Sequence, residues 1–285
     1  MPASHSLHAR IAAGRQALVD AGFKPEDAAL DADVLARHVL GWDLARLLAH
    51  DREPATPAFS ERFQAVIGRR VRREPVAFIT GHREFWGLDF EVTPATLVPR
   101  PETEMIVDEA LRLFPESASP TVLDVGTGTG CLAVAIAVER PRARMTATDI
   151  SHAALLVARR NAHAHGVAGR VRFVRTDLAR GLRVPADLIV SNPPYVPDQT
   201  ASSLPADVAS YEPATALFGG SDGLAVIRRL FAGARHHLAP GGTFIVEFGF
   251  GQEDSVRQLA SDHGWHVAGL LHDLQGIPRT IVLRR

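Results

Sequence analysis

The sequence predicts an α/β fold whose open, mostly parallel sheet is covered by helices on both faces. Beyond Pro120, short β-prone runs alternate with helical stretches, and repeated strand–helix units of this kind build parallel sheets. Upstream, residues 5–74 carry helical periodicity, and residues 76–100 carry short β-prone runs broken by glycine and proline. We therefore expect a helical domain over 1–75, a β-hairpin linker over 76–100 and an α/β domain over 101–285.

Apolar runs, and the residues that bound them, predict the individual elements. Prolines in the segment Pro99–Glu104 fix the chain before a helix that is expected over 102–114. Strands are expected in the linker at Val76–Thr80 and Glu84–Val92, and in the α/β domain at Thr121–Val125, Arg144–Thr148, Val171–Arg175, Asp187–Ser191 and Thr243–Phe248. Helices are expected near 131–139, 152–165, 223–238 and 252–262, and a reversed pair of edge strands at Trp265–Leu271 and Thr280–Leu283.

Composition and charge narrow the class of protein. The chain has 285 residues, of which 46% are hydrophobic, and this is ample for the cores of two domains. The 31 basic and 32 acidic residues nearly balance, so the global positive charge of a non-specific nucleic-acid binder is absent. The single cysteine, Cys131, excludes an internal disulfide and a cysteine-based zinc site. Because residues 1–30 show no apolar targeting segment or membrane span, we expect a cytoplasmic protein without a membrane partner.

Thirteen histidines raise the question of a metal site. The pairs His163/His165 and His236/His237 lie in alanine-rich or arginine-rich helical stretches that lack carboxylates at ligand spacing. We interpret them as exposed helix side chains and expect no bound metal.

A basic cluster, Arg69-Arg70-Val71-Arg72-Arg73, lies near the end of the helical domain. Such a cluster can contact nucleic acid, or it can form a solvated helix face whose cations complement the helix dipole. We favour the second interpretation and expect no direct nucleic-acid partner.

A glycine-rich turn follows the first strand of the α/β domain. The run Asp124-Val125-Gly126-Thr127-Gly128-Thr129-Gly130 leads from an apolar strand into a helix that begins at Cys131. Glycine has no Cβ and tolerates positive φ, so a ligand can approach the backbone of such a turn closely. The dinucleotide fingerprint G-x-G-x-x-G would need glycine at position 131, whereas the spacing here is G-x-G-x-G.

This variant resembles the first motif of the class I S-adenosylmethionine-dependent methyltransferases, which have a Rossmann-like fold. The next strand ends at Asp149, where a carboxylate can accept hydrogen bonds from both ribose hydroxyls. The third strand ends at Asp177-Leu178, a position that lines the adenine ring in this fold, although Asp177 taken alone can also be a turn former. The resemblance implies S-adenosyl-L-methionine as cofactor and S-adenosyl-L-homocysteine as product, with cofactor contacts from Gly126, Thr127, Gly128, Thr129, Gly130, Asp149, Asp177, Leu178 and Asn192.

The fourth strand ends at Asn192-Pro193-Pro194-Tyr195. Ligands of doubly wound sheets bind beyond the carboxyl ends of the strands, so this loop is expected beside the glycine turn. A planar amide or aromatic NH2 group could donate its protons to Asn192 Oδ1 and the Pro193 carbonyl, while two prolines stiffen the loop and Tyr195 offers a flat face. We predict these four residues as the catalytic and substrate-binding site. The alternative is a Pro-Pro turn in which Asn192 forms an Asx turn.

The tetrapeptide with this fold is shared by enzymes that act on adenine N6, cytosine N4 and glutamine N5, so it does not define the acceptor. The rest of the chain resembles bacterial protein-glutamine methyltransferases of the HemK/PrmC type, which modify class I peptide-chain release factors. The resemblance is carried by Arg73–Val76, Thr80–Gly87, Pro94–Glu104, Asp124–Gly130, Ser191–Val196, Glu212-Pro213, Ala216-Leu217 and Gly219–Gly223.

This resemblance implies methyl transfer to N5 of the glutamine in the Gly-Gly-Gln loop of a release factor, which tunes translation termination. It also implies that the helical domain recognises the substrate protein, and we expect a monomer. The alternatives are a ribosomal protein glutamine methyltransferase, whose family departs from the Pro99–Glu104 segment, a nucleic-acid adenine N6-methyltransferase, and a non-catalytic cofactor-binding protein. Glu102 and Glu104 either face the substrate or act as first-turn acids of the following helix.

Overall fold

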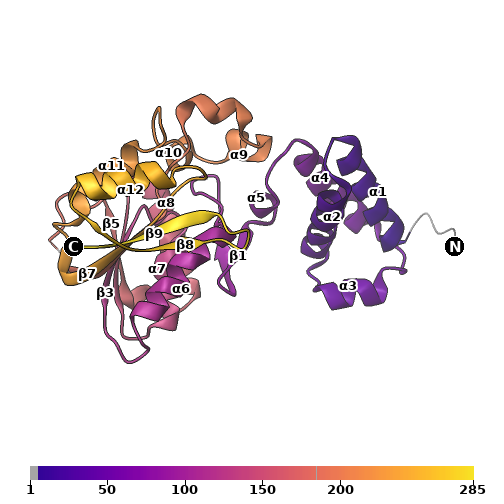
Figure 1. Ribbon diagram of the computed structural model, residues 1–285. Helices are drawn as coiled ribbons and strands as arrows, with labels where there is room; N and C mark the ends of the chain where they lie inside the picture. The colour runs from indigo at the N-terminus through magenta and orange to yellow at the C-terminus, as the bar shows by residue number, and fades with distance from the viewer. Residues whose placement is uncertain (1–5, 184) are drawn as a thin grey trace. The chain divides into compact units, whose positions relative to one another are not determined.

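The computed structural model describes residues 6–183 and 185–285, so the first five residues of the predicted helical domain lie outside the described residues. The chain divides into two compact units (Figure 1). The first contains residues up to Gly81 together with Ala206–Tyr211, and the second contains His82–Pro205 and Glu212–Arg285. No helix among the described residues is long and apolar enough to cross a membrane.

The first unit consists of helices whose starts are set by capping side chains and prolines. Ser6, Asp43 and Thr56 each accept a backbone N–H of the helix that follows, as N-cap residues typically do. Its core is continuous from helix to helix, and a Cβ on Gly14 would lie 2.7 Å from the Phe63 ring, so only glycine allows this close packing. The helices are α1 (Leu7–Asp20), α2 (Pro25–Leu40), α3 (Leu44–His50), α4 (Pro57–Val71), α5 (Val76–Thr80) and α9 (Ala206–Tyr211).

The prediction of a strand at Val76–Thr80 is wrong, because this segment is helix α5. Pro75 precedes it, and the Pro75 carbonyl accepts the N–H groups of Phe78 and Ile79. Gly81 ends it in the left-handed conformation, with φ of 80°. An apolar run of five residues is too short for its periodicity to distinguish a buried helical turn from a strand. The flanking proline and glycine therefore determined that this segment is helical. The division between units consequently follows Gly81 rather than residue 75.

The basic cluster at Arg69–Arg73 is largely engaged within the first unit. Arg69 Nε donates to Glu74 at 2.8 Å, and Arg70 Nε donates to Asp31 at 2.7 Å. Arg73 donates to the Ala21 carbonyl at 2.6 Å. Arg70 is only 8% exposed, whereas Val71 and Arg72 are exposed, so three of the arginines are engaged in ion pairs and hydrogen bonds and only part of the cluster is the solvated face that we favoured.

The pairing of Arg70 predicts a large loss of stability on its removal. Arg70→Met keeps most of the side-chain volume but leaves the largely buried Asp31 carboxylate, whose side chain is 15% exposed, without its cation, which we expect to lower the free energy of unfolding by about 3 kcal/mol. Urea unfolding followed by circular dichroism measures the change. Arg62→Met, an exposed position on the same helix, is the control and should change stability by less than about 0.5 kcal/mol. Equal effects of the two substitutions would contradict the prediction.

The second unit begins with a hairpin, β1 (His82–Phe85) and β2 (Leu88–Glu91), whose two-residue turn has positive φ at Trp86 and Gly87. Phe85 and Phe90 bury their rings in the core of this unit. The remaining described strands form a seven-stranded sheet in the order β5-β4-β3-β6-β7-β9-β8, parallel except for β9, which is antiparallel to β7 and β8. The strands are β3 (Thr121–Val125), β4 (Arg144–Asp149), β5 (Val171–Arg175), β6 (Ala186–Ser191), β7 (Leu238–Glu247), β8 (His266–His272) and β9 (Pro278–Arg284).

Helices cover both faces of this sheet, as predicted. Successive residues of β3 divide between two hydrophobic clusters: Val122 packs with helices α6, α7 and α8, and Leu123 packs with helices α11 and α12. Figure 1 shows α6 and α7 on one side of the sheet and α11 and α12 on the other. The helices are α6 (Glu104–Leu113), α7 (Cys131–Glu139), α8 (His152–Ala164), α10 (Ala214–Leu217), α11 (Ala225–Ala234) and α12 (Glu253–Asp262), with short 3-10 turns η2 (Pro101–Thr103), η3 (Ala168–Arg170) and η4 (Asp198–Ser203).

The predicted elements of the α/β domain are confirmed to within a few residues, including the reversed edge pair. The largest difference among the strands is at β7, which begins at Leu238 rather than Thr243. The helices α9 and α10 were not predicted, because segments of six and four residues are too short to show a helical period.

Candidate active site

A cavity of about 350 Å³ lies beyond the carboxyl ends of the central strands. The order of the strands reverses between β3 and β6, and such a switch point is where doubly wound sheets bind ligands. Ser191 at the end of β6 donates to the Val125 carbonyl at the end of β3, at 2.7 Å, which ties the two strand ends together. The predicted site residues that line the cavity are Gly126, Thr127, Gly128, Thr129, Asp149, Asp177, Leu178, Asn192 and Pro194.

Three of the predicted residues are not among those that line the cavity: Gly130, Pro193 and Tyr195. Gly130 packs against helix α8, where a Cβ would lie 3.0 Å from the Ala158 Cβ. Its φ of 83° also requires glycine, so this position serves the packing of the turn on the helix. The role of Gly130 as a cofactor contact stays a prediction, as do the substrate contacts of Pro193 and Tyr195.

The glycine turn borders open space on the cavity side. A Cβ on Gly126 or Gly128 would meet no protein atom within 4 Å, so a ligand can approach this backbone closely. Thr127 donates its hydroxyl to Asp124 Oδ2 at 2.5 Å, and the Gly126 and Thr127 N–H groups donate to the Thr148 carbonyl. These bonds hold the turn on the ends of β3 and β4.

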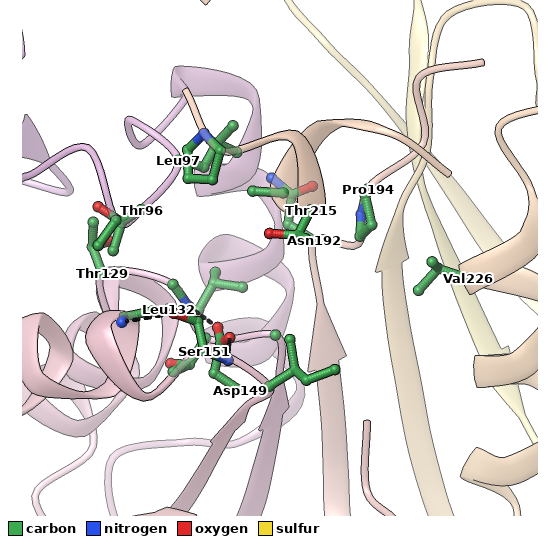
Figure 2. A pocket seen from close by; sticks show the side chains of 18 of the residues that line it. Thr96, Leu97, Thr129, Leu132, Asp149, Ser151, Asn192, Pro194, Thr215 and Val226 are labelled. Carbon is green, nitrogen blue, oxygen red and sulfur yellow. Dashed lines mark hydrogen bonds between the residues drawn. The ribbon is translucent and has the colours of Figure 1, made fainter. Parts of the chain in front are cut away.

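Asp149 is oriented by backbone donors. Gly128 N–H donates to its Oδ2 at 3.0 Å and Ser151 N–H to its Oδ1 at 2.8 Å, while burial raises the pKa of the carboxyl. A carboxylate has about four acceptor positions, so each oxygen can accept one bond more. Figure 2 shows Asp149 and Ser151 at one end of the cavity and Asn192 with Thr215 at the other. The pair of acceptors fits two neighbouring hydroxyls, such as those of a ribose.

Asp177 and Leu178 form another part of the cavity wall. The Asp177 carboxylate accepts from Arg229 at 2.5 Å, and the Asp177 carbonyl accepts the Arg180 N–H in a turn. Leu178 has a backbone φ of 56°, which is uncommon for residues other than glycine, asparagine and aspartate. Asp177 is thus both a turn residue and a wall residue, and its predicted contact with adenine stays a prediction.

Asn192 belongs to a hydrogen-bonded network that the sequence did not reveal. Its Nδ2 donates to Thr103 Oγ1 at 2.9 Å, and Thr103 Oγ1 donates to Glu247 Oε2 at 2.7 Å. The Tyr195 hydroxyl donates to Glu247 Oε1 at 3.1 Å. Burial raises the pKa of Glu247 to about 7, and burial next to this carboxylate raises the pKa of Tyr195. An acid inside the apolar run of β7 was the available sequence signal for Glu247.

The loop that carries Asn192 is also held from outside. Gln252 donates its Nε2 to the Tyr195 carbonyl at 2.9 Å and accepts the Gly249 N–H at 2.8 Å. A Cβ on Gly223 would lie 2.2 Å from the Tyr195 carbonyl oxygen, and one on Gly219 would lie 2.7 Å from that of Pro194. The glycines of the segment Gly219–Gly223 therefore allow two stretches of backbone to meet behind the loop.

The segment that precedes helix α6 is fixed by a second buried acid. Glu212 accepts from Arg100 at 2.6 Å and from the Val98 N–H at 3.3 Å, and this side chain is only 1% exposed. Arg100 lines the cavity, whereas neither Glu102 nor Glu104 is among the lining residues. Glu104 accepts the Trp86 N–H at 2.8 Å, so it holds the turn of the hairpin.

Cys131 lines the cavity but does not provide a thiolate. Burial raises the pKa of its thiol to about 12, so the sulfur is protonated at neutral pH. The side chain acts as a small, uncharged wall residue.

Comparison with known proteins identifies both parts of the chain. The family model of the PrmC N-terminal domain matches residues 11–81, and that of the methyltransferase small domain matches residues 106–207. Among solved structures, the ribosomal protein L11 methylase from Lactobacillus delbrueckii subsp. bulgaricus is 19% identical, with a TM-score of 0.51 over 68% of this chain and 83% of that chain. The hMettl16 catalytic domain in complex with MAT2A 3'UTR hairpin 6 is 14% identical, with a TM-score of 0.57 over 73% and 79%. The fold and the match to the methyltransferase small domain define a methyltransferase of the Rossmann-like class.

Curated relatives narrow this class to one family. The release factor glutamine methyltransferase of Bradyrhizobium diazoefficiens is 42% identical over 91% of this chain and 89% of its own length. Those of Burkholderia pseudomallei and Moorella thermoacetica are 44% and 45% identical, over 88% and 81% of this chain and 90% and 82% of their own lengths. The chain belongs to the release factor glutamine methyltransferase family.

The buried Asp124 predicts a pH dependence of stability. Burial raises its pKa from 3.8 to about 7, so the folded state binds a proton more tightly than the unfolded state between these values. The stability that this proton contributes is complete below the unfolded pKa and is lost as the pH rises through about 7. The free energy of unfolding should therefore fall from pH 5 to pH 8, by at most about 1.4 kcal/mol for each unit.

Asp124→Asn removes this titration while keeping an oxygen that can accept from Thr127. The difference in free energy of unfolding between the native protein and this variant, measured by urea titration at several pH values, isolates Asp124 from other buried acids. A difference that does not change with pH in this window would contradict the prediction.

Proposed function

We propose that this protein transfers a methyl group from S-adenosyl-L-methionine to the side-chain amide nitrogen of the glutamine in the Gly-Gly-Gln loop of class I peptide-chain release factors. Family membership over most of the chain supports the substrate class. The observation that carries the chemistry is the amide of Asn192, held by Thr103 at the wall of the cavity that also contains Asp149. A bound substrate and cofactor would then meet in one cavity.

The cofactor site consists of the glycine turn and the wall residues at the ends of β4 and β5. Asp149 would accept the ribose hydroxyls, the open backbone of Gly126 and Gly128 would border the amino acid end, and Leu178 would pack against the adenine. When bound, S-adenosyl-L-methionine supplies an electrophilic methyl group on its sulfonium. The product would be S-adenosyl-L-homocysteine.

The residues of the loop act on the substrate amide. An amide nitrogen is a weak nucleophile because its lone pair is delocalised into the carbonyl, so it must be held with its lone-pair face toward the methyl carbon. Asn192 Oδ1 and the Pro193 carbonyl would each accept one NH2 proton, which fixes the plane of the amide. The nitrogen becomes acidic as it gains the methyl group, and one of its two protons then leaves to water, so no strong base is needed beforehand.

We further propose that the helical unit recognises the release factor, and that the enzyme acts as a monomer in the cytoplasm, where release factors meet the ribosome. Ion pairs and hydrogen bonds engage Arg69, Arg70 and Arg73 of the basic cluster, so this cluster gives little support to a nucleic-acid substrate. A transfer assay with labelled cofactor compares a release factor, the large-subunit ribosomal proteins and DNA as acceptors. Label on the Gly-Gly-Gln peptide is expected; label on another acceptor alone would refute the proposal.

Asn192→Ala separates binding of the cofactor from transfer. Removal of the amide oxygen should lower kcat/KM for the release factor by about a hundredfold or more, because the acceptor nitrogen loses its orientation. Titration calorimetry with S-adenosyl-L-homocysteine should show that the variant still binds this product. Undiminished transfer would exclude Asn192 from the site.

Asp149→Ala, unlike Asn192→Ala, should weaken binding of the cofactor itself. Loss of hydrogen bonds to a charged acceptor, each worth about 1.5–3 kcal/mol, should weaken binding of the cofactor by roughly tenfold to a hundredfold or more. The control is Asp108→Ala, an exposed acid on helix α6, which should leave the dissociation constant unchanged. Equal affinities in the two variants would contradict the assignment of Asp149.

A further inference from the structure

The proposed transfer leaves one buried acid without a role. Glu247 is the last residue of β7 and is only 1% exposed. Among the described residues it has no ion-pair partner, and it accepts hydrogen bonds from the hydroxyls of Thr103 and Tyr195. The nearby Arg279 is paired with Asp273. Burial of a carboxylate with two neutral donors costs stability, so its presence behind the substrate loop calls for an explanation.

The directions of the hydrogen bonds supply that explanation. An ionised carboxylate can only accept, so Thr103 must donate its single hydroxyl proton to Glu247. The Thr103 oxygen can then only accept toward Asn192, which forces the NH2 side of that amide to face Thr103. The carbonyl side, Oδ1, is left as the acceptor, and no hydrogen bond to it is found in the part of the chain that the structure describes.

We propose that Glu247, acting through Thr103, is a positioning residue that keeps Asn192 in the amide orientation in which Oδ1 accepts a proton of the substrate amide. This inference rests on the proposed function. Without the carboxylate, the Thr103 hydroxyl can donate to Asn192 instead, and the amide can turn its NH2 group toward the substrate. Two NH2 groups would then face each other, and the substrate would lose an acceptor.

Tyr195 belongs to the same hydrogen-bonded network. Its hydroxyl occupies the second oxygen of Glu247 at 3.1 Å, which holds the carboxylate so that the first oxygen faces Thr103. The loop residue that the sequence assigned to the substrate thus also braces the acid behind the loop. Each end of Asn192-Pro193-Pro194-Tyr195 is tied to Glu247, the first through Thr103 and the last directly.

Two substitutions break the network at different points while changing the shape of the site little. Glu247→Gln replaces the obligate acceptor by a group that can also donate, and Thr103→Val removes the hydroxyl that connects it to Asn192. We expect each variant to lower kcat/KM for a Gly-Gly-Gln peptide roughly tenfold to a hundredfold, with a raised KM for the peptide and a lowered kcat. The dissociation constant for S-adenosyl-L-homocysteine should stay the same.

Matched variants separate positioning from stability. Thr103→Ser restores the hydroxyl and should recover most of the activity that Thr103→Val loses. Thr280→Val is the control: Thr280 lies opposite Glu247 on the neighbouring strand, is fully buried, and has an Oγ1 without a hydrogen-bond partner among the described residues. Its substitution should leave kcat/KM unchanged.

The pH profile provides a second readout. Glu102 and the Tyr195 and Thr103 hydroxyls face Glu247 from neighbouring elements, as do the Arg279 guanidinium and the Cys131 thiol, and burial among them raises its pKa to about 7. Protonation would let Glu247 donate and would release the constraint on Thr103. We therefore expect kcat/KM of the native enzyme to rise between pH 6 and pH 8, and Glu247→Gln to lose most of this rise.

The side-chain amide of Asn192 gives a readout that does not need transfer. Its NH2 signals in nitrogen-edited NMR spectra, assigned by their loss in Asn192→Asp, should exchange slowly with water in the native protein and in Thr103→Ser. They should exchange faster in Glu247→Gln and Thr103→Val. If the native protein transfers the methyl group, and Glu247→Gln and Thr103→Val match it in kcat/KM and in amide exchange, the positioning role is overturned. If the native protein transfers no methyl group but the exchange pattern is as expected, only the proposed function is refuted.

Discussion

The site depends on one geometric constraint, which is that the carboxyl ends of β3, β4 and β6 meet at one edge of a parallel sheet. This edge brings the glycine turn, Asp149 and Asn192 to the wall of one cavity, although they are far apart in the sequence. The bond from Ser191 to the Val125 carbonyl joins β3 and β6 where the order of strands reverses. The glycine turn, Asp149 and Asn192 lie at these strand ends, so the sheet sets the distance between the cofactor site and the acceptor loop.

Buried acids near the cavity orient the groups around them by accepting their hydrogen bonds. Asp124 binds the hydroxyl of the glycine turn, Glu212 fixes the segment before α6 through Arg100, and Glu247 binds Thr103 and Tyr195. Burial raises the pKa values of Asp124 and Glu247 because the charged form loses its hydration. Burial of these acids lowers stability, but it fixes the direction of the donors that they bind. Acids with shifted pKa values are common in active sites.

Much of the fold was predictable because its signals are local. Apolar runs bounded by glycine and proline located the strands, and the residues that follow them located Asp149 and Asn192. The prediction of a strand at Val76–Thr80 failed because the β-preference of these residues was weaker than the effect of the flanking proline and glycine. The partners of Asn192 could not be found locally, since Thr103 lies 89 residues from Asn192 and 144 from Glu247 in the sequence. Only the folded sheet shows that these side chains touch, and so the sequence located the acceptor loop but missed what holds it.

The most direct test of this account is a crystal structure of the protein with S-adenosyl-L-homocysteine and a peptide that contains Gly-Gly-Gln. The quantity to measure is the distance from the glutamine amide nitrogen to Asn192 Oδ1. We predict a hydrogen bond of about 2.9 Å, with the ribose hydroxyls on Asp149 and the nitrogen facing the sulfur. A glutamine bound away from Asn192, or a cofactor bound away from Asp149, would contradict the account.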